Sequence, residues 1–254
     1  MCTLLLAHRP TPGTLLAVAS NRNEFLARPA EGIAVWPAEV GLALPRIVAP
    51  RDSKAGGTWL GVNDRGLFVC LTNRRNATLS ADRASRGQLV AQALRLPDSR
   101  AVHEWMGTLE GERYNGFHLV AADLEEAWLA IGDGHTIERD ELSPGVHVIT
   151  ERSFGAGEGP RESQCRAAYA ALFHEGDPTV EELRRPMQAH ADTGQSPLES
   201  ACVHAELFGY GTRSSFELVV PISGSVQALW SEGKTCTAEA RDVSSLLDGS
   251  FAAR

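Results

Sequence analysis

Two short apolar runs open the chain: residues 2–7 read CTLLLA and residues 14–20 read TLLAVAS, with HRPTPG at residues 8–13 between them. Apolar and β-branched residues on either side of a proline- and glycine-rich connection are typical of two strands joined by a turn. We therefore predict an antiparallel hairpin that begins with the first residues of the chain.

The register of this hairpin decides which residues lie beside the amino terminus. With the turn centred near residues 10–11, Cys2 pairs with Ala19 or Ser20. The polar residues 21–24, NRNE, then come close to the amino terminus. We therefore expect a polar cluster beside the second residue of the chain.

Periodicity and turn residues predict further elements along the chain. The predicted strands are two within 56–73 around a turn at 63–66, then 117–122, 127–131 and 146–150, and a hairpin of 214–222 with 226–230. The predicted helices are 85–96, 162–175 and 179–190. The first and last of these helices begin at capping boxes, Ser85 with Gln88 and Thr179 with Glu182, and Pro97 ends the first.

Composition is typical of a globular protein. The 254 residues are 43% hydrophobic and 22% charged, which is enough apolar surface for a sizeable core. Strands at both ends with helices between them favour an α+β fold over alternating βαβ units. Because no linker, repeat or low-complexity tract interrupts the pattern, we expect one domain over residues 1–254.

Charge and motif content exclude several classes of function. The 24 Lys and Arg against 32 Asp and Glu give a net charge of −8, so we expect no nucleic-acid or anionic-membrane partner. No segment resembles a signal peptide or a membrane span, and the five dispersed cysteines fit reduced thiols, so we expect a cytoplasmic protein. Nucleotide-binding loops, zinc-protease motifs and serine-hydrolase elbows do not occur in the sequence.

We expect no metal site and no cofactor. Cys202 and His204 form the closest Cys/His pair, but their spacing matches no common zinc motif, so we interpret them as an ordinary thiol and imidazole. His8 and His118 are chemically able to hold a haem iron. Isolated histidines, however, are far more often ordinary surface or core residues.

Cys2 is the strongest candidate for chemistry because it directly follows the initiator methionine. A small second residue permits removal of Met1, which would leave a cysteine with both a thiol and a free α-amine. Near neutral pH such an amine can accept the proton of the thiol, so one residue supplies nucleophile and base. Without this processing, Cys2 is only a small residue at the start of a strand.

Arg22 and Glu24 strengthen the case for Cys2. They alternate along the predicted second strand and therefore lie on one face of it. A guanidinium beside a thiolate stabilises the thiolate, and a nearby carboxylate can hold the α-amine. The alternative is an ion pair at a solvated strand end, worth about 0–1 kcal/mol.

Several motifs in a consistent order resemble the NRDE family, which includes the transport and Golgi organisation 2 proteins. They are MCT at 1–3, SNRNEFLARP at 20–29, APRD at 49–52, GGTWLGVN at 56–63, LTNRR at 71–75, SRG at 85–87 and YGTRSS at 210–215. The resemblance is dense over residues 1–96 and returns near residue 210. It implies a fold like the N-terminal-nucleophile (Ntn) hydrolases, a four-layer αββα sandwich with two antiparallel sheets between helices.

The resemblance also implies roles for individual residues. Cys2 matches the nucleophile, and Arg22 matches the arginine at the strand end beside it. Asn73 resembles a residue that helps form an oxyanion hole, and Arg213 matches a late arginine of the group. The residues expected to line the substrate site are Trp59, Thr72, Tyr210 and Thr212.

Two positions depart from the family pattern. Asn23 replaces the signature acid, so the carboxylate expected to orient the α-amine is either supplied by Glu24 or missing. Glu151 follows Thr150 where the family usually has an asparagine after a serine. Its charge would repel a developing oxyanion unless the carboxyl is protonated or turned away.

Two hypotheses follow from these residues. In the first, the protein is an Ntn-type amidohydrolase or acyltransferase that acts on a small amide, thioester or acyl substrate. The residues assigned to its catalytic site are Cys2, Arg22, Asn23, Glu24, Asn73 and Arg213. In the second, the scaffold has lost hydrolysis and instead binds and moves haem, or an acyl-CoA or other lipid.

Overall fold

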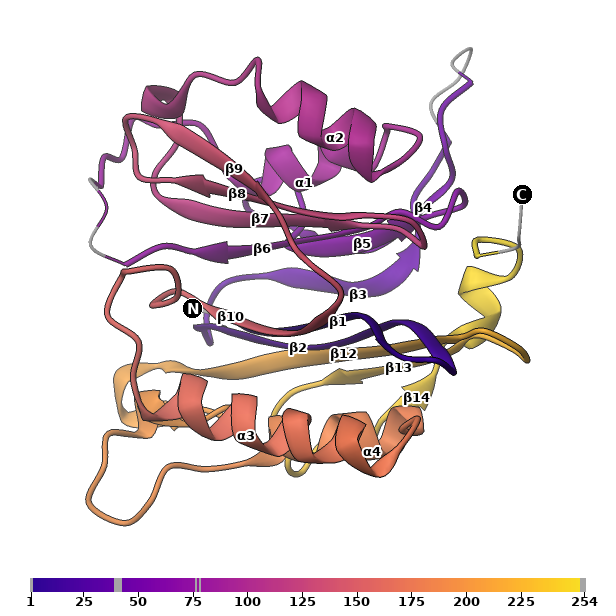
Figure 1. The fold of residues 1–254 in the computed structure, drawn as a ribbon. Coiled ribbons are helices and arrows are strands. Elements are labelled where there is room, and N and C mark those ends of the chain that lie inside the picture. The colour runs from indigo at the N-terminus through magenta and orange to yellow at the C-terminus, as the bar shows by residue number, and fades with distance from the viewer. Residues whose placement is uncertain (1, 39–42, 76, 78, 252–254) are drawn as a thin grey trace. The chain divides into compact units, whose positions relative to one another are not determined.

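The computed structural model describes residues 2–38, 43–75, 77 and 79–251. Within these ranges the chain forms two compact units, each built on one seven-stranded antiparallel sheet (Figure 1). The first unit runs to Arg28 and resumes over Pro144–Ser245, and the second comprises Pro29–Ser143 and the residues from Leu246 onward. The predicted α+β class with two antiparallel sheets is confirmed. That residues 1–254 fold as a single domain stays a prediction.

The sheet of the first unit has the strand order β10-β1-β2-β12-β13-β14, and β11 pairs with β12. Its strands are β1 (Cys2–Thr11), β2 (Thr14–Phe25), β10 (Gly145–Thr150), β11 (His204–Ala205), β12 (Tyr210–Pro221), β13 (Gln227–Glu232) and β14 (Arg241–Asp242). Both predicted hairpins of this sheet, β1 with β2 and β12 with β13, are confirmed.

The predicted register of the first hairpin is wrong. Cys2 pairs with Arg22 rather than with Ala19 or Ser20. The reason is that both strands continue to a two-residue turn at residues 12–13, later in the chain than the sequence pattern suggested. This shift brings the arginine directly opposite the cysteine.

Helices α3 (Pro160–Glu175) and α4 (Val180–Arg184) pack on one face of this sheet (Figure 1). The predicted capping box of α4 is confirmed, since the Thr179 hydroxyl accepts from Glu182 N at 3.2 Å and the Glu182 carboxylate accepts from Thr179 N at 3.0 Å. The helix is shorter than predicted because Pro186 follows, and a 3₁₀ turn replaces its second half. The residues that form the core on this face are Leu5, Ala7, Ala17, Ala19, Val148, Cys165, Tyr169, Phe173, Val180, Leu183, Met187, Ala201, Val219 and Leu229.

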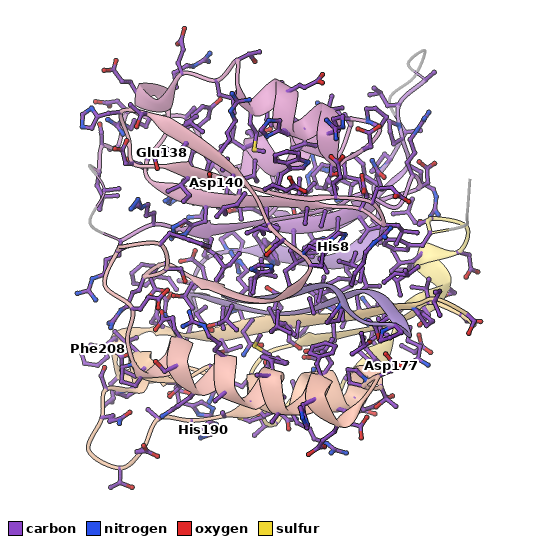
Figure 2. All side chains as sticks on the ribbon, in the orientation of Figure 1. His8, Glu138, Asp140, Asp177, His190 and Phe208 are labelled. Atoms are coloured by element: carbon purple, nitrogen blue, oxygen red, sulfur yellow. The ribbon has the colours of Figure 1, made fainter. Side chains whose placement is uncertain are left out.

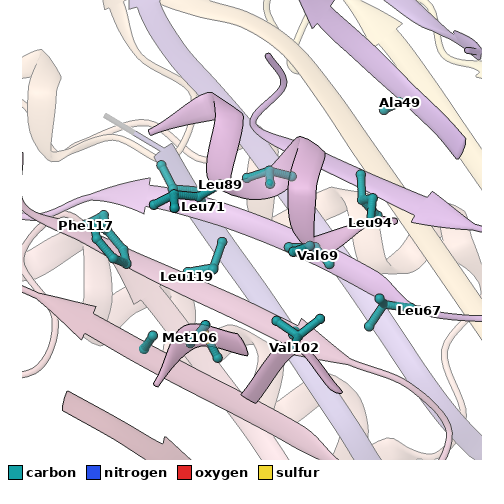
Figure 3. Packing of buried hydrophobic residues seen from close by; sticks show 14 of the residues in the cluster. Ala49, Leu67, Val69, Leu71, Leu89, Leu94, Val102, Met106, Phe117 and Leu119 are labelled. Carbon is teal, nitrogen blue, oxygen red and sulfur yellow. The ribbon is translucent and has the colours of Figure 1, made fainter. Parts of the chain in front are cut away.

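The sheet of the second unit has the order β3-β4-β5-β6-β7-β8-β9. Its strands are β3 (Ala30–Val35), β4 (Ile47–Asp52), β5 (Leu60–Asn63), β6 (Phe68–Asn73), β7 (Phe117–Ala122), β8 (Ala127–Gly132) and β9 (Ile137–Glu141). Helices α1 (Gly87–Ala93) and α2 (Ser99–Met106) pack on one face, over a core of aliphatic and aromatic side chains (Figure 3). The 3₁₀ turns of the described chain are η1 (Gly111–Arg113), η2 (Arg185–Gln188), η3 (Pro197–Glu199), η4 (Glu206–Phe208) and η5 (Ser244–Leu247).

The capping box predicted for α1 does not form. The helix begins at Gly87 with Arg86 as its N-cap residue, and no side chain caps it. The side-chain amide of Gln88 donates instead to the backbone carbonyl of Ala55 at 3.0 Å. None of the helices in the described ranges has both the length and the apolar character needed to cross a bilayer.

Candidate active site

Cys2 is the first residue of β1 and is half-buried. It pairs with the buried Arg22, which pairs on its other side with Ser214 of β12. Directly opposed residues of antiparallel strands have Cβ atoms about 4.5–5.5 Å apart. Because Leu5 belongs to the core under α3 and α4, alternation places Cys2, Arg22, Glu24 and Ser214 on the opposite face of the sheet.

Tyr210 is the first residue of β12 and pairs with Phe25 of β2. Its hydroxyl donates to the Asn23 carbonyl at 2.6 Å, and its ring packs edge-on against Phe25 with centroids 5.4 Å apart. Burial, followed by the negative charges of Cys2 and Glu24, raises the pKa of Tyr210 above its usual range. The phenol is therefore neutral at pH 7, and its proton is donated to the Asn23 carbonyl.

Asn23 is buried, with its side chain on the face opposite to Cys2. Its Oδ1 accepts from the hydroxyl of Thr212 at 2.6 Å, and that hydroxyl accepts from Val203 N at 2.8 Å. Asn23 and Thr212 thus tie β2, β12 and the segment before β11 together. These bonds give both residues a structural role in addition to the site roles predicted for them.

Arg213 also makes structural contacts. Its guanidinium donates to three carbonyls at and just after the end of β2, those of Phe25 at 3.1 Å, Leu26 at 2.5 Å and Arg28 at 3.1 Å. These contacts hold the chain segment that follows β2 against β12.

Glu151 lies just beyond β10, whose last residue Thr150 pairs with Thr3, the neighbour of Cys2. The Glu151 carboxylate is buried, and Nη2 of Arg161 donates to its two oxygens at 2.7 and 2.6 Å. The negative charge of Glu151, which would repel an oxyanion, is therefore compensated by the buried guanidinium of Arg161.

Arg161 is a residue that the sequence reasoning missed. It lies in the first turn of α3, 3.7 Å from a Glu162 oxygen, and its side chain is 1% exposed. Although burial opposes the effect, hydrogen bonds from the Thr150 hydroxyl and Gly159 N hold the pKa of Glu162 below its usual value. No local pattern marks Arg161, because Glu151, the carboxylate to which it donates, lies just beyond β10 and meets it only in the folded chain.

The remaining predicted site residues belong to the second unit. Asn73 is the half-buried last residue of β6. The hydroxyl of Thr72 lies 3.1 Å from Nδ1 of His118 on β7, and both side chains are buried. Trp59 is buried just before β5. The oxyanion and substrate-binding roles of Asn73, Thr72 and Trp59 remain predictions.

Comparison with known sequences identifies the family. A sequence model of the family described as Transport and Golgi organisation 2 matches residues 1–231. The chain belongs to this family. Transport and Golgi organization protein 2 homologs from Bos taurus and Homo sapiens are 30% and 29% identical to it, each over 89% of this chain and 91% of the relative.

Solved structures show the fold of this Transport and Golgi organisation 2 family member. The C2A mutant of conjugated bile acid hydrolase from Clostridium perfringens is similar with a TM-score of 0.57 and 11% identity, covering 97% of this chain and 94% of that one. For an N-acylethanolamine-hydrolyzing acid amidase ortholog from Caenorhabditis elegans the TM-score is 0.58 and the identity 10%, over 86% of this chain and 92% of that one. For penicillin V acylase from Agrobacterium tumefaciens the TM-score is 0.50 and the identity 11%, over 91% of this chain and 86% of that one. The predicted likeness to the Ntn-hydrolase fold is thereby confirmed.

Proposed function

We propose that this protein is an Ntn-type cysteine amidohydrolase or acyltransferase, in which Cys2 becomes the nucleophile once Met1 has been removed. The observation that carries the proposal is the pairing of Cys2, at the first position of β1, with a buried arginine directly opposite it. Arg22 would stabilise the thiolate through its positive charge. Met1 itself lies outside the described residues.

The proposed reaction uses both groups of the processed cysteine. The α-amine accepts the thiol proton, the sulfur attacks the carbonyl carbon of an amide or thioester, and a C–S bond forms. The C–N or C–S bond to the leaving group then breaks, and the leaving group takes the proton from the α-ammonium. Water, or an acceptor amine or thiol, attacks the acyl-enzyme thioester and regenerates the Cys2 thiol.

Neighbouring residues would assist these steps. Glu24, on the same face as Cys2 and Arg22, is the carboxylate that would hold the α-ammonium, whereas the Asn23 side-chain oxygen already accepts from Thr212.

The names of the structural neighbours support the same reaction class. They are named as a conjugated bile acid hydrolase, an N-acylethanolamine-hydrolyzing acid amidase and a penicillin V acylase. The first was solved as a C2A mutant, so that hydrolase also has a cysteine at its second position. A cysteine in that place is the feature shared with this chain.

The alternative is a protein that binds and moves haem or an acyl-CoA without hydrolysis. Two departures from the family pattern motivated it, at Asn23 and at Glu151. The pairing of Glu151 with Arg161 weakens the second of these reasons, because a compensated carboxylate repels an oxyanion less. The alternative therefore rests mainly on Asn23.

Covalent labelling with a thiol-directed acyl probe tests the proposal. We expect the probe to label the unmodified protein but not Cys2→Ala. The control is Cys70→Ala, which removes a buried cysteine of β6 and should still be labelled. A variant with a lysine inserted between Met1 and Cys2, which retains the methionine, should also stay unlabelled. Equal labelling of Cys2→Ala would overturn the proposal. Saturable haem or acyl-CoA binding by an unlabelled protein would favour the alternative.

A further inference from the structure

Four side chains from three separate stretches of the sequence meet within the first unit: His190, Cys202, His204 and Cys236. One ligand atom from each, a ring nitrogen or Sγ, lies within 4.8 Å of all the others. His190 comes from the segment between η2 and β11 (Figure 2), and Cys236 from the turn after β13. The cluster was not predicted, because only Cys202 and His204 are close in the sequence.

The distances within the cluster fit a tetrahedral metal site. Sγ of Cys202 lies 3.5 Å from Sγ of Cys236 and 3.7 Å from Nε2 of His204, and that nitrogen lies 3.1 Å from Sγ of Cys236. With Zn–S of about 2.3 Å and Zn–N of about 2.0–2.1 Å, tetrahedral edges are about 3.8 Å for S–S and about 3.6 Å for S–N. All three distances fall within about 0.5 Å of those edges.

The fourth side chain closes the ligand set. The rings of His190 and His204 have centroids 4.7 Å apart and are tilted by 53°, and a ligand atom of His190 lies within 4.8 Å of those of the other three residues. We propose that these four residues bind one Zn²⁺ ion. Two thiolates carry two negative charges and neutral imidazoles carry none, so the ligand set balances the charge of the ion.

Charged neighbours fit the same interpretation. A Glu206 oxygen lies 3.9 Å from Nδ1 of His204, on the ring nitrogen that does not face the sulfurs. Carboxylates near the second nitrogen of a metal-binding histidine orient the ring and are common around zinc. The ammonium of Lys234 would repel a cation, but it is paired with the same Glu206 carboxylate.

The site would be structural. Four protein ligands leave no open coordination position, which is the arrangement of zinc sites that hold chain segments together. The ion would link the irregular segment 189–203 and β11 to the turn after β13. Both linked segments also contact Asn21, which donates to the carbonyl of Ala201 at 2.9 Å and accepts from the hydroxyl of Thr235 at 2.6 Å. The ion would thus fix the part of the chain that supports β2 next to Arg22.

Metal analysis of the reduced, untagged protein tests this proposal without any assay of activity. We expect one zinc per chain after dialysis, measured by plasma mass spectrometry. The affinity for zinc, measured by competition with a chelator, should fall more than about tenfold in Cys236→Ser and in His190→Ala, because losing a ligand weakens affinity by at least the effect of losing a second-shell partner. The matched controls Cys70→Ala and His174→Ala should keep the metal, and so should Cys2→Ala, which separates this test from the proposed reaction.

Cobalt substitution keeps the test decisive where a variant fails to fold. Co²⁺ added to the metal-free, unmodified protein should give the intense visible absorption of a tetrahedral site and a sulfur-to-cobalt charge-transfer band. The absence of both bands, with no zinc bound on titration, would overturn the proposal. So would an unchanged zinc affinity in Cys236→Ser, or a Cys202–Cys236 disulfide in metal-free protein purified in the presence of a reductant.

Discussion

Replacing Arg161 with methionine tests the buried ion pair beside the candidate active site. Methionine keeps much of the apolar length of the arginine, so the main loss is the guanidinium. The side chains of Arg161 and Glu151 are 1% and 6% exposed, and their charged atoms approach to 2.6 Å. In Arg161→Met the Glu151 carboxylate would stay buried, with a guanidinium nitrogen of Arg152 at 3.7 Å as its nearest remaining ion-pair contact of those described.

Removal of one partner from a buried ion pair costs about 3–5 kcal/mol, because the other charge remains desolvated. In a chain of this size, about 1 kcal/mol lowers the melting temperature by about 2–4 °C. We therefore expect Arg161→Met to lower the melting temperature by about 6–20 °C. The double variant Glu151→Gln/Arg161→Met removes both charges and should recover most of this loss.

The same helix offers a matched control. Arg166 pairs with Glu158 at 3.3 Å, but these side chains are 51% and 42% exposed, so Arg166→Met should cost only about 0–1 kcal/mol. Thermal unfolding followed by circular dichroism measures all three variants. The reasoning is refuted if Arg161→Met is no less stable than Arg166→Met, or if the double variant is as unstable as Arg161→Met.

Two further variants test a buried charge of the first unit and a close backbone contact of the second. Burial raises the pKa of Glu217 to about 7, although Arg184 beside it acts in the other direction. Between the ordinary glutamate pKa of about 4.3 and this raised value, the folded protein holds a proton that the unfolded chain has released, so stability falls as pH rises. Melting temperatures over pH 5–7 should therefore fall for the unmodified protein and stay nearly flat for Glu217→Gln, and parallel slopes would contradict this. A Cβ on Gly57 would lie 2.4 Å from the carbonyl carbon of Gly87. Gly57→Ala should therefore lower the free energy of unfolding in urea by about 1–3 kcal/mol. An unfolding midpoint equal to that of the unmodified protein would contradict this and show that α1 can shift away from the added methyl group.

Local patterns predicted most strands of the first unit, the four central strands of the second and three helices. They did not predict α2, the strands β3, β4 and β9, or the short strands β11 and β14. Alternation predicted Arg22 and Glu24 on one face of a strand, and both residues belong to β2. The predicted register of the first hairpin was wrong because residues 8–13, HRPTPG, allow more than one turn position. Only the full pairing of β1 with β2 selects among these positions. The capping box at Ser85 failed because a tertiary contact, the carbonyl of Ala55, takes the Gln88 side chain.

The site was predictable only where its residues are close in sequence or in a hairpin. Cys2 and Arg22 meet through one turn, so the sequence indicates their proximity. Arg161 meets Glu151 through the docking of a helix, and Cys236 lies 34 positions from Cys202. Such contacts depend on how elements pack, and neither charge nor spacing in the sequence encodes them locally.

The most direct test of Cys2 as an activated nucleophile is the intact mass of the purified protein before and after exposure to a thiol-directed acyl probe. We predict a chain lighter than the encoded one by a single methionine, and one adduct that peptide mapping places on the amino-terminal peptide. Retention of Met1, or an adduct elsewhere with Cys2 unmodified, would contradict the proposed chemistry.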